Sequence, residues 1–220
     1  MNQLAPGVME RSPSPRRILV ITYWAYGDAL VQTYVLPYLR IIQKELPPGS
    51  VIYLVTLEPA DAGPVPVQEG VVHHPFTYRR YGIGGAWMIM QVLVQCAGLI
   101  RREQIDALHA WCTAAGLLGY ILSLLSGRPL VIDGDEPQAE AMVENGSWKR
   151  TGLAFRILFL AERLQTKRAA AVIATTEGMR DYALCAYGSV PERFHVKPAC
   201  VDLDRFAEKE LKKPELLRAL

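Results

Sequence analysis

Three carboxylates stand within four positions of the sequence, at Asp133, Asp135 and Glu136. They follow an apolar run of strand length, so they belong at the carboxyl end of a predicted strand. Carboxylates in such a place bind hydroxyl groups of a ligand or act as a general base, and their mutual repulsion favours a proton on one of them. An exposed acidic loop with Asp as a turn former explains the same residues.

Polar residues at the starts of two predicted helices are further candidates for contact with a ligand. Gly27 and Asp28 separate an apolar run from a helical pattern, where glycine lets a ligand approach the backbone and the helix N-terminus attracts phosphate. Asp28 serves equally well as a plain N-cap. Thr175, Thr176 and Glu177 open a later helix, where a cap again explains the residue types, although the loop faces the same edge. No Gly-x-Gly-x-x-Gly, P-loop, G-x-S-x-G or H-E-x-x-H pattern occurs, so these catalytic and dinucleotide motifs are excluded.

The histidines offer weaker candidates. His109 lies in a predicted strand and is either a cleft residue or a core or surface histidine. His73 and His74 are adjacent, and adjacent strand residues point to opposite faces, so the two cannot easily ligate one metal. We therefore predict no metal site, and we assign no catalytic residue.

Two basic segments suggest contact with phosphate or with a membrane. Tyr78–Tyr81 places Arg79 and Arg80 between aromatic residues, which suits phosphate headgroups or a pyrophosphate-linked acceptor, or simply a solvated loop. The predicted helix over 148–167 belongs to a segment with six cations and one acid. Such a helix lies on an anionic bilayer, or it buries its apolar stripe on a sheet. That stripe consists of Leu153, Ile157, Leu160 and Leu164.

The pattern of elements predicts how these residues are positioned. Apolar runs of strand length occur at 17–22, 51–57, 71–73, 107–111, 129–133, 170–175 and 194–198. Helical patterns occur at 29–45, 86–103, 114–125, 148–167 and 177–187, with a loop or short helix at 134–147. Strands that alternate with helices indicate a Rossmann-like three-layer α/β/α domain with a mostly parallel sheet of about seven strands. Pro37, inside the first helix, predicts a kink.

Composition narrows the class of protein. Lys and Arg total 24 against 22 for Asp and Glu, so the net charge of +2 argues against a nucleic-acid partner. The polar segment 1–16 has no signal-peptide core, and we expect a disordered leader on a cytoplasmic protein. The apolar stretches 86–100 and 113–125 fall short of the roughly 20 residues of a membrane span and predict buried helices. Four scattered cysteines predict free thiols.

Several segments in this order resemble the N-terminal domain of family-4 glycosyltransferases, over 17–206. The strand Ile18–Thr22 with its Gly27 loop is similar to their first βα unit, and Ser126–Asp135 to their fifth strand. The segment from Ala169 resembles their sixth strand and the next helix start, and Arg193–Phe206 resembles the closing Val-Asp-x-x-x-Phe stretch. The chain departs from the pattern in having one glycine after the first strand and Ala-Cys before Val-Asp.

The resemblance implies one half of a GT-B enzyme, on the acceptor side. Such an enzyme transfers a sugar from a nucleotide-diphosphate sugar to a glycan or lipid-linked acceptor, here with retention, in cell-wall or polysaccharide biosynthesis. It implies that the donor sits on a C-terminal domain, with 207–220 as linker or the start of that domain, so this half binds no cofactor and is inactive alone. We expect a cytoplasmic location, with contact to the inner face of the membrane as a second interpretation. The alternatives are a non-catalytic membrane- or acceptor-binding subunit that recruits a separate catalytic chain, and an unrelated Rossmann-like or flavodoxin-like enzyme.

Overall fold

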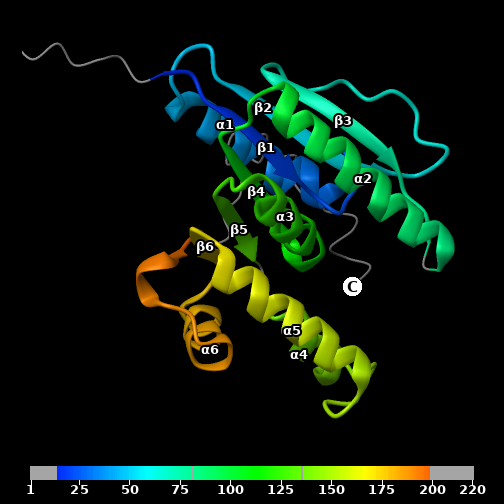
Figure 1. Ribbon diagram of the computed structural model, residues 1–220, viewed down its shortest axis with the longest axis vertical. Coiled ribbons are helices and arrows are strands. Elements are labelled where there is room, and N and C mark those ends of the chain that lie inside the picture. Colours follow the sequence, from blue (N-terminus) through cyan, green and yellow to red (C-terminus); the bar gives the residue numbers. More distant parts are fainter. Residues whose placement is uncertain (1–13, 81, 135, 199–220) are drawn as a thin grey trace, which may run out of the picture.

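A computed structural model of the chain describes residues 14–80, 82–134 and 136–198. Its centre is a seven-stranded sheet in the order β3-β2-β1-β4-β5-β6-β7, and all neighbouring strands pair in parallel (Figure 1). The strands are β1 Arg17–Ile21, β2 Val51–Glu58, β3 Val71–Thr77, β4 Ala107–Trp111, β5 Leu130–Gly134, β6 Ala171–Ala174 and β7 Phe194–Val196. The Rossmann-like α/β fold predicted from the sequence is confirmed.

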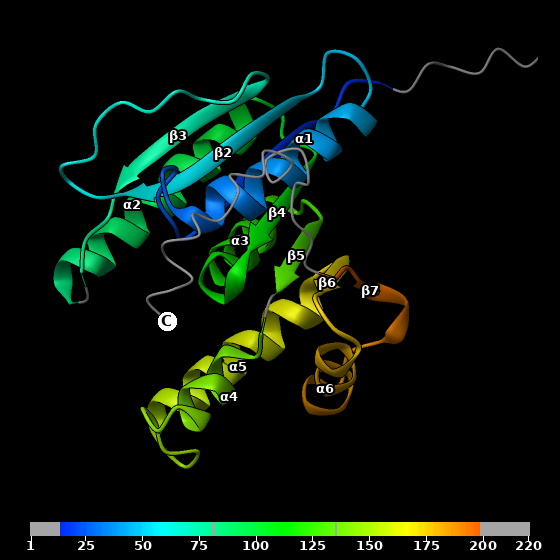
Figure 2. The same cartoon turned by 180° about the vertical axis from the view of Figure 1, so that it is seen from behind.

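The helices cover the two faces of this sheet unequally. They are the π-helical turn η1 Val31–Val35, α1 Leu36–Glu45, α2 Ile83–Arg102, α3 Cys112–Ser126, α4 Gln138–Glu144, α5 Leu153–Arg168, α6 Glu177–Tyr187 and the short 3-10 turn η2 Pro191–Arg193. The crossovers from β1 to β3 and those from β3 onward run along the sheet in opposite directions, and right-handed crossovers then lie on opposite faces. Accordingly α1 covers one face (Figure 2), while α2, α3 and α6 pack on the other with α5 against α3 (Figure 1).

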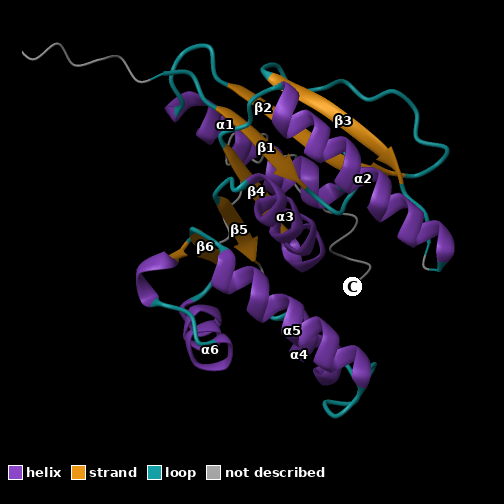
Figure 3. Cartoon of the chain, viewed as in Figure 1, coloured by secondary structure: helices purple, strands orange, loops and turns teal. Residues whose placement is uncertain are grey.

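The central strands are buried on both sides. Successive residues of β1 point to opposite faces, so Leu19 and Ile21 join the core under α2 and α3, and Val20 joins the core under α1. The nearly continuous apolar runs of the sequence reflect this double burial. The connection from β2 to β3 is a loop without a helix, drawn in teal in Figure 3, so the α1 face has no second covering helix there.

The two elements that contain Pro75 and Pro37 differ in detail from the sequence prediction. We predicted a third strand of only three residues, yet β3 continues through Pro75 to Thr77. Pro75 is tolerated because β3 is an edge strand of the sheet, where a missing N–H costs no ladder hydrogen bond. The kink expected at Pro37 takes the form of the π-helical turn η1, in which the N–H of Leu36 donates to the carbonyl of Val31.

The helix α5 buries the face opposite to the one we predicted. Its buried residues are Phe155, Ala161, Glu162, Gln165 and Thr166. The apolar stripe of Leu153, Ile157, Leu160 and Leu164 is 40–73% exposed, so the interpretation that this stripe covers the sheet is wrong. The physical reason is that α5 packs on α3, α4 and α6 through a polar network around Glu162.

The helix α2 also differs from the buried helix that we expected. Met88, Val92 and Cys96 lie in the core, whereas Trp87 and Val94 on the other side are exposed. Because a helix in the outer layer of the fold contacts the sheet on one side only, its composition cannot reveal that the other side stays open. Cys96, Cys112 and Cys185 carry free thiols as predicted, and Cys200 lies outside the described residues.

Close packing of α3 on the sheet depends on Gly119. A Cβ atom there would lie 2.8 Å from Leu130 Cδ1 and 3.3 Å from Ala110 Cβ, whereas a Cβ at Gly98 in α2 meets nothing within 4 Å. We expect Gly119→Val to lower the free energy of unfolding by about 1–3 kcal/mol through overpacking. The matched variant Gly98→Val should change it by less than about 0.5 kcal/mol, since glycine and valine are both poor helix formers. Chemical denaturation measures both, and equal effects would contradict this view of the packing.

Candidate functional site

The carboxyl ends of the parallel strands meet at one edge, which is where open α/β sheets bind ligands. The β1–α1 loop, which carries Gly27, is held at this edge by β2. The N–H of Tyr26 donates to Glu58 Oε1 over 2.8 Å, and the N–H of Leu57 donates to the carbonyl of Trp24 over 3.2 Å. The loop is therefore a fixed part of the sheet edge.

Asp28 caps the helix that follows β1, and Gly27 leaves the backbone beside it accessible to a ligand. Asp28 Oδ1 accepts from the N–H of Leu30 over 2.8 Å, and the Asp28 carbonyl accepts from Gln32. Both bonds are those of a helix N-cap. Gly27 is exposed, and a Cβ atom there would find no other heavy atom within 4 Å. The backbone at Gly27 is thus open to a ligand.

Asp133 is a buried, paired charge. Its side chain is only 2% exposed, and its Oδ2 lies 2.5 Å from Lys197 Nζ. The same ammonium lies 3.5 Å from the ring centre of Tyr38 and 4.6 Å from that of Trp111. The pair therefore ties the segment after β7 to β5, β4 and α1, and Asp133 is not part of an exposed acidic loop. Asp135 lies outside the described residues, and Glu136 is exposed.

His109 lies inside the sheet rather than in a cleft. It is 7% exposed, and its ring centre is 5.2 Å from that of Trp111. Burial, with a smaller contribution from the charge of Lys197, lowers the pKa of His109 to about 3. Nε2 has no hydrogen-bond partner among the described residues. The imidazole is neutral at physiological pH and serves as part of the core.

The start of α6 is a capped helix, as its residue types suggested. Thr176 Oγ1 accepts from the N–H of Met179 over 3.1 Å, and Glu177 forms an ion pair with Arg180. Thr175 is half-buried at the end of β6. Within the part of the chain that the structure describes, no three His, Cys, Asp or Glu side chains gather as a metal site.

The sequence analysis missed a polar cluster at the ends of β2 and β3. Thr56 Oγ1 donates to Glu58 Oε1 over 2.5 Å and lies 2.7 Å from His73 Nε2. Because the one hydroxyl proton goes to Glu58, His73 must donate its Nε2–H to Thr56, which fixes the tautomer. Burial lowers the pKa of His73, while Glu58 opposes this shift. Among the described residues the side-chain hydrogen bonds and the ion pair of Glu58 are all made by Oε1, so Oε2 is available to a ligand.

A pocket of about 420 Å³ adjoins this cluster. Glu58, His73, Phe76 and the loop 59–65 line it. The signal that could have revealed the cluster is the period of two on β2, where Thr56 and Glu58 are polar on an otherwise apolar strand. His73 and His74 do point to opposite faces, toward Tyr26 and Tyr53 respectively.

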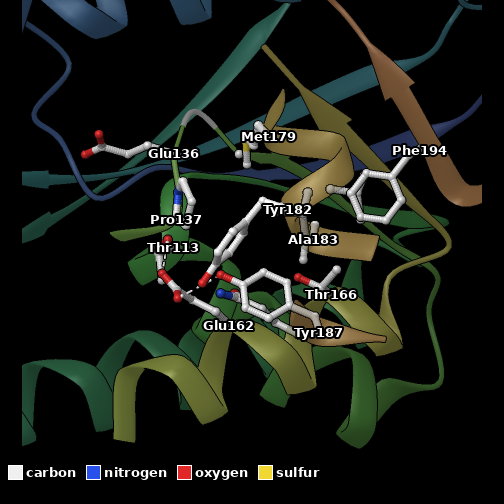
Figure 4. A pocket seen from close by; sticks show the side chains of 14 residues that line it. Thr113, Glu136, Pro137, Glu162, Thr166, Met179, Tyr182, Ala183, Tyr187 and Phe194 are labelled. Carbon is white, nitrogen blue, oxygen red and sulfur yellow. Dashed lines mark hydrogen bonds between the residues drawn. The ribbon is translucent and has the colours of Figure 1, made fainter. Parts of the chain in front are cut away.

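A second, much smaller cavity of about 30 Å³ lies beside Glu162 between α3, α5 and α6 (Figure 4). Glu162 accepts from Tyr187 over 3.0 Å and from the N–H of Ala139 over 3.1 Å. Desolvation raises the pKa of Glu162, and these hydrogen bonds partly counter it. Glu136 stands at the rim of the pocket and points away from it in Figure 4. The hydrogen bonds brace the α4–α5 segment against α6.

Comparison with known proteins agrees with this fold. Residues 50–205, most of the chain, match the family model described as Glycosyltransferase Family 4. The chain belongs to glycosyltransferase family 4.

Individual relatives agree with that membership. A segment of 91 residues, 40% of the chain and 22% of the relative, is 36% identical to the alpha-maltose-1-phosphate synthase of Mycolicibacterium smegmatis. The structure of a sucrose-phosphate synthase from Thermosynechococcus elongatus superimposes with a TM-score of 0.65 at 12% identity, over 86% of this chain and 49% of that one. A UDP-glucosyltransferase from Polygonum tinctorium gives 0.60 at 12% identity, over 94% and 56%. The chain thus spans about half the length of these solved enzymes and has the fold of one GT-B domain.

The buried His109 makes stability depend on pH. The pKa of His109 is about 3 in the folded protein, against the ordinary value of 6.5 for an exposed histidine in the unfolded chain. Below about pH 6.5 the unfolded chain therefore binds a proton that the folded protein does not. The resulting stability is complete above the unfolded pKa and is lost as the pH falls toward the folded pKa, by about 2 kcal/mol between about pH 8 and pH 5. We expect His109→Leu to remove that part of the acid sensitivity, as measured by urea unfolding at both pH values. The exposed His195→Gln is the control, and identical pH slopes in all three proteins would contradict the assignment.

The Asp133–Lys197 pair predicts a non-additive pair of substitutions. Lys197→Met strands the carboxylate of Asp133 in the interior and should cost about 3 kcal/mol of unfolding free energy. Adding Asp133→Asn removes the stranded charge, so the double variant should recover about half of that loss. Lys44→Met on the exposed side of α1 serves as the control and should be neutral. A double variant no more stable than Lys197→Met alone would contradict the role of the pair.

Proposed function

We propose that this domain is the acceptor-binding half of a glycosyltransferase that uses a nucleotide-diphosphate sugar. The observation that carries the proposal is the polar pocket at Glu58 and His73, which opens at the carboxyl edge of a domain of glycosyltransferase family 4. Ligands of open α/β sheets bind at that edge. A glycan or the sugar of a lipid-linked acceptor offers the hydroxyl groups that a free carboxylate oxygen accepts.

The pocket combines a fixed acceptor atom with an apolar wall. Glu58 Oε1 is held by Thr56 and by the N–H of Tyr26, so the carboxylate is oriented before a ligand arrives. Pro75 and the proline-containing loop 59–65 provide surfaces on which a sugar ring can pack. Such preorganisation reduces the entropy lost on binding. We assign Glu58 and His73 to acceptor binding and not to a chemical step.

The donor belongs to a second domain in this proposal. The open backbone at Gly27 and the helix start behind it offer only a few hydrogen bonds to a diphosphate, each worth about 1 kcal/mol. Retention of the anomeric configuration, donor binding and stabilisation of the leaving diphosphate would then depend on the donor-binding domain. Cell-wall or polysaccharide synthesis at the cytoplasmic side is the setting that we propose.

The 220-residue chain should transfer no sugar from a panel of UDP- and GDP-sugars to glycan or lipid-linked acceptors. It should bind UDP or GDP with a Kd of about 1 mM or weaker in calorimetry, because few groups contact the diphosphate. Robust turnover, or micromolar binding of a nucleotide, would contradict the division between acceptor and donor halves. An acceptor that binds while a separate chain restores transfer would instead support the subunit alternative.

A substitution tests the pocket itself. Glu58→Gln removes the negative charge from the hydrogen bond to a sugar hydroxyl and should weaken acceptor binding roughly 10- to 100-fold. Glu69→Gln, which alters an exposed carboxylate on the same β2–β3 loop, should bind acceptors like the parent protein. Saturation-transfer NMR with a panel of glycans measures both. Equal binding by the two variants would remove Glu58 from the site.

A further inference from the structure

We propose that the outward face of α2, α3 and α5 docks on an anionic lipid bilayer. This outer helix surface carries exposed apolar side chains on all three helices, among them Trp87, Val94, Leu117, Leu124, Ile157 and Leu160. The helices lie side by side in front of the sheet in Figure 1, and α3 contacts both α2 and α5. The proposal goes beyond sugar transfer and does not depend on the acceptor pocket.

The apolar side chains follow the helical period on the solvent side. On α2, Ile83, Trp87, Met90 and Val94 are spaced by three and four residues and are 54–92% exposed. On α5 the exposed stripe that begins at Leu153 has the same spacing. Scattered single apolar residues are normal on protein surfaces, whereas aligned exposed stripes on helices that contact one another are the pattern expected of an interaction site.

The α2 helix has the composition of a membrane-spanning segment, but one of its sides packs against the sheet. By length and by its mean hydropathy of 1.7 it could cross a bilayer, yet a third of that window is buried inside the fold. Met88, Val92 and Cys96 occupy the core against the sheet, so α2 cannot leave the domain without unfolding it. A helix held in this way can only enter the interfacial layer of a membrane with its outer side.

Charge distinguishes a bilayer from other occupants. Within α2, α3 and α5 the only acidic residue is Glu162, which is 3% exposed and faces inward. The exposed cations on these helices are Arg101, Arg102, Arg156, Arg163, Lys167 and Arg168. On α1 and α6 acids and cations are mixed, as Arg180 and Asp181 on α6 illustrate, and α4 carries only acids. Arg102 pairs with Glu103 just past the end of α2, whereas the other five cations form no ion pair among the described residues. Apolar side chains beside such cations match the acyl and headgroup layers of an anionic membrane.

A second copy of the chain is a poor occupant for the same reason. Face-to-face pairing would bring Arg156 and Arg163 of both copies together without an acidic partner.

Arg79 and Arg80 add a basic rim at the start of α2, where the N–H of Arg79 contacts Met88 Sδ at 3.2 Å. That end of α2 follows β3, so the rim lies at the same sheet edge as the acceptor pocket.

Vesicle sedimentation tests the charge requirement. The chain should bind vesicles of phosphatidylcholine mixed with phosphatidylglycerol and not vesicles of phosphatidylcholine alone, and salt should weaken the binding. Arg156→Gln with Arg163→Gln should reduce the partition coefficient roughly 30-fold, from the contribution of each cation near a charged surface. Arg40→Gln with Lys44→Gln on α1 removes the same charge from the opposite face and should change nothing. Equal binding to both vesicle types, or equal loss in both variants, would overturn the proposal.

Tryptophan fluorescence tests the orientation independently of the charges. Trp87 is 58% exposed, so its emission should shift to shorter wavelength when its side chain enters the bilayer interface. Trp87→Phe should keep the binding and lose the shift. A shift that persists in Trp87→Phe would place another surface on the membrane. Light scattering that finds a stable dimer disrupted by Ile157→Glu would make the outer helix surface an interface between copies and would also overturn the proposal.

Discussion

The parallel pairing of all seven strands is the constraint on which the rest of the structure depends. It brings every carboxyl end to one edge and forces each connection to cross over a face of the sheet. Since crossovers are right-handed, the direction of travel along the sheet decides the face on which each helix lies. The connections from β1 to β3 run over one face and contribute only α1 there, and the later connections place α2, α3 and α6 on the other.

This imbalance links the two proposals. On the α1 face, the helix-free connection from β2 to β3 leaves room for the pocket beside Glu58 and His73. On the other face, α5 is carried outward by its packing on α3, and a polar network around Glu162 holds it there. The sheet edge then presents acceptor-binding groups beside a helical layer suited to a bilayer. Such an arrangement suits an enzyme whose acceptor is anchored in lipid.

The sequence predicted the fold well because strand runs and helical periods are local signals. The buried runs of β2 and β4 and the capped start of α6 at Thr176 lie close to where the patterns placed them. Two features depended on the position of an element in the tertiary structure, which neighbouring residues in the sequence do not reveal. Pro75 continues a strand because β3 is at the sheet edge, and the Leu153 stripe is exposed because α5 rests on helices. Asp133 likewise looked like an acidic-loop residue until the fold brought Lys197, 64 positions later, to its carboxylate.

The central claim is that acceptors bind at the carboxyl edge on the α1 face. Hydrogen exchange by mass spectrometry, with and without glycan and lipid-linked sugar acceptors, tests it most directly. The account predicts slower exchange in peptides covering the β1–α1 loop at 22–30 and the β2–β3 loop at 58–66, with no change in α6. Protection confined to α6 or to the pocket around Glu162 would contradict it.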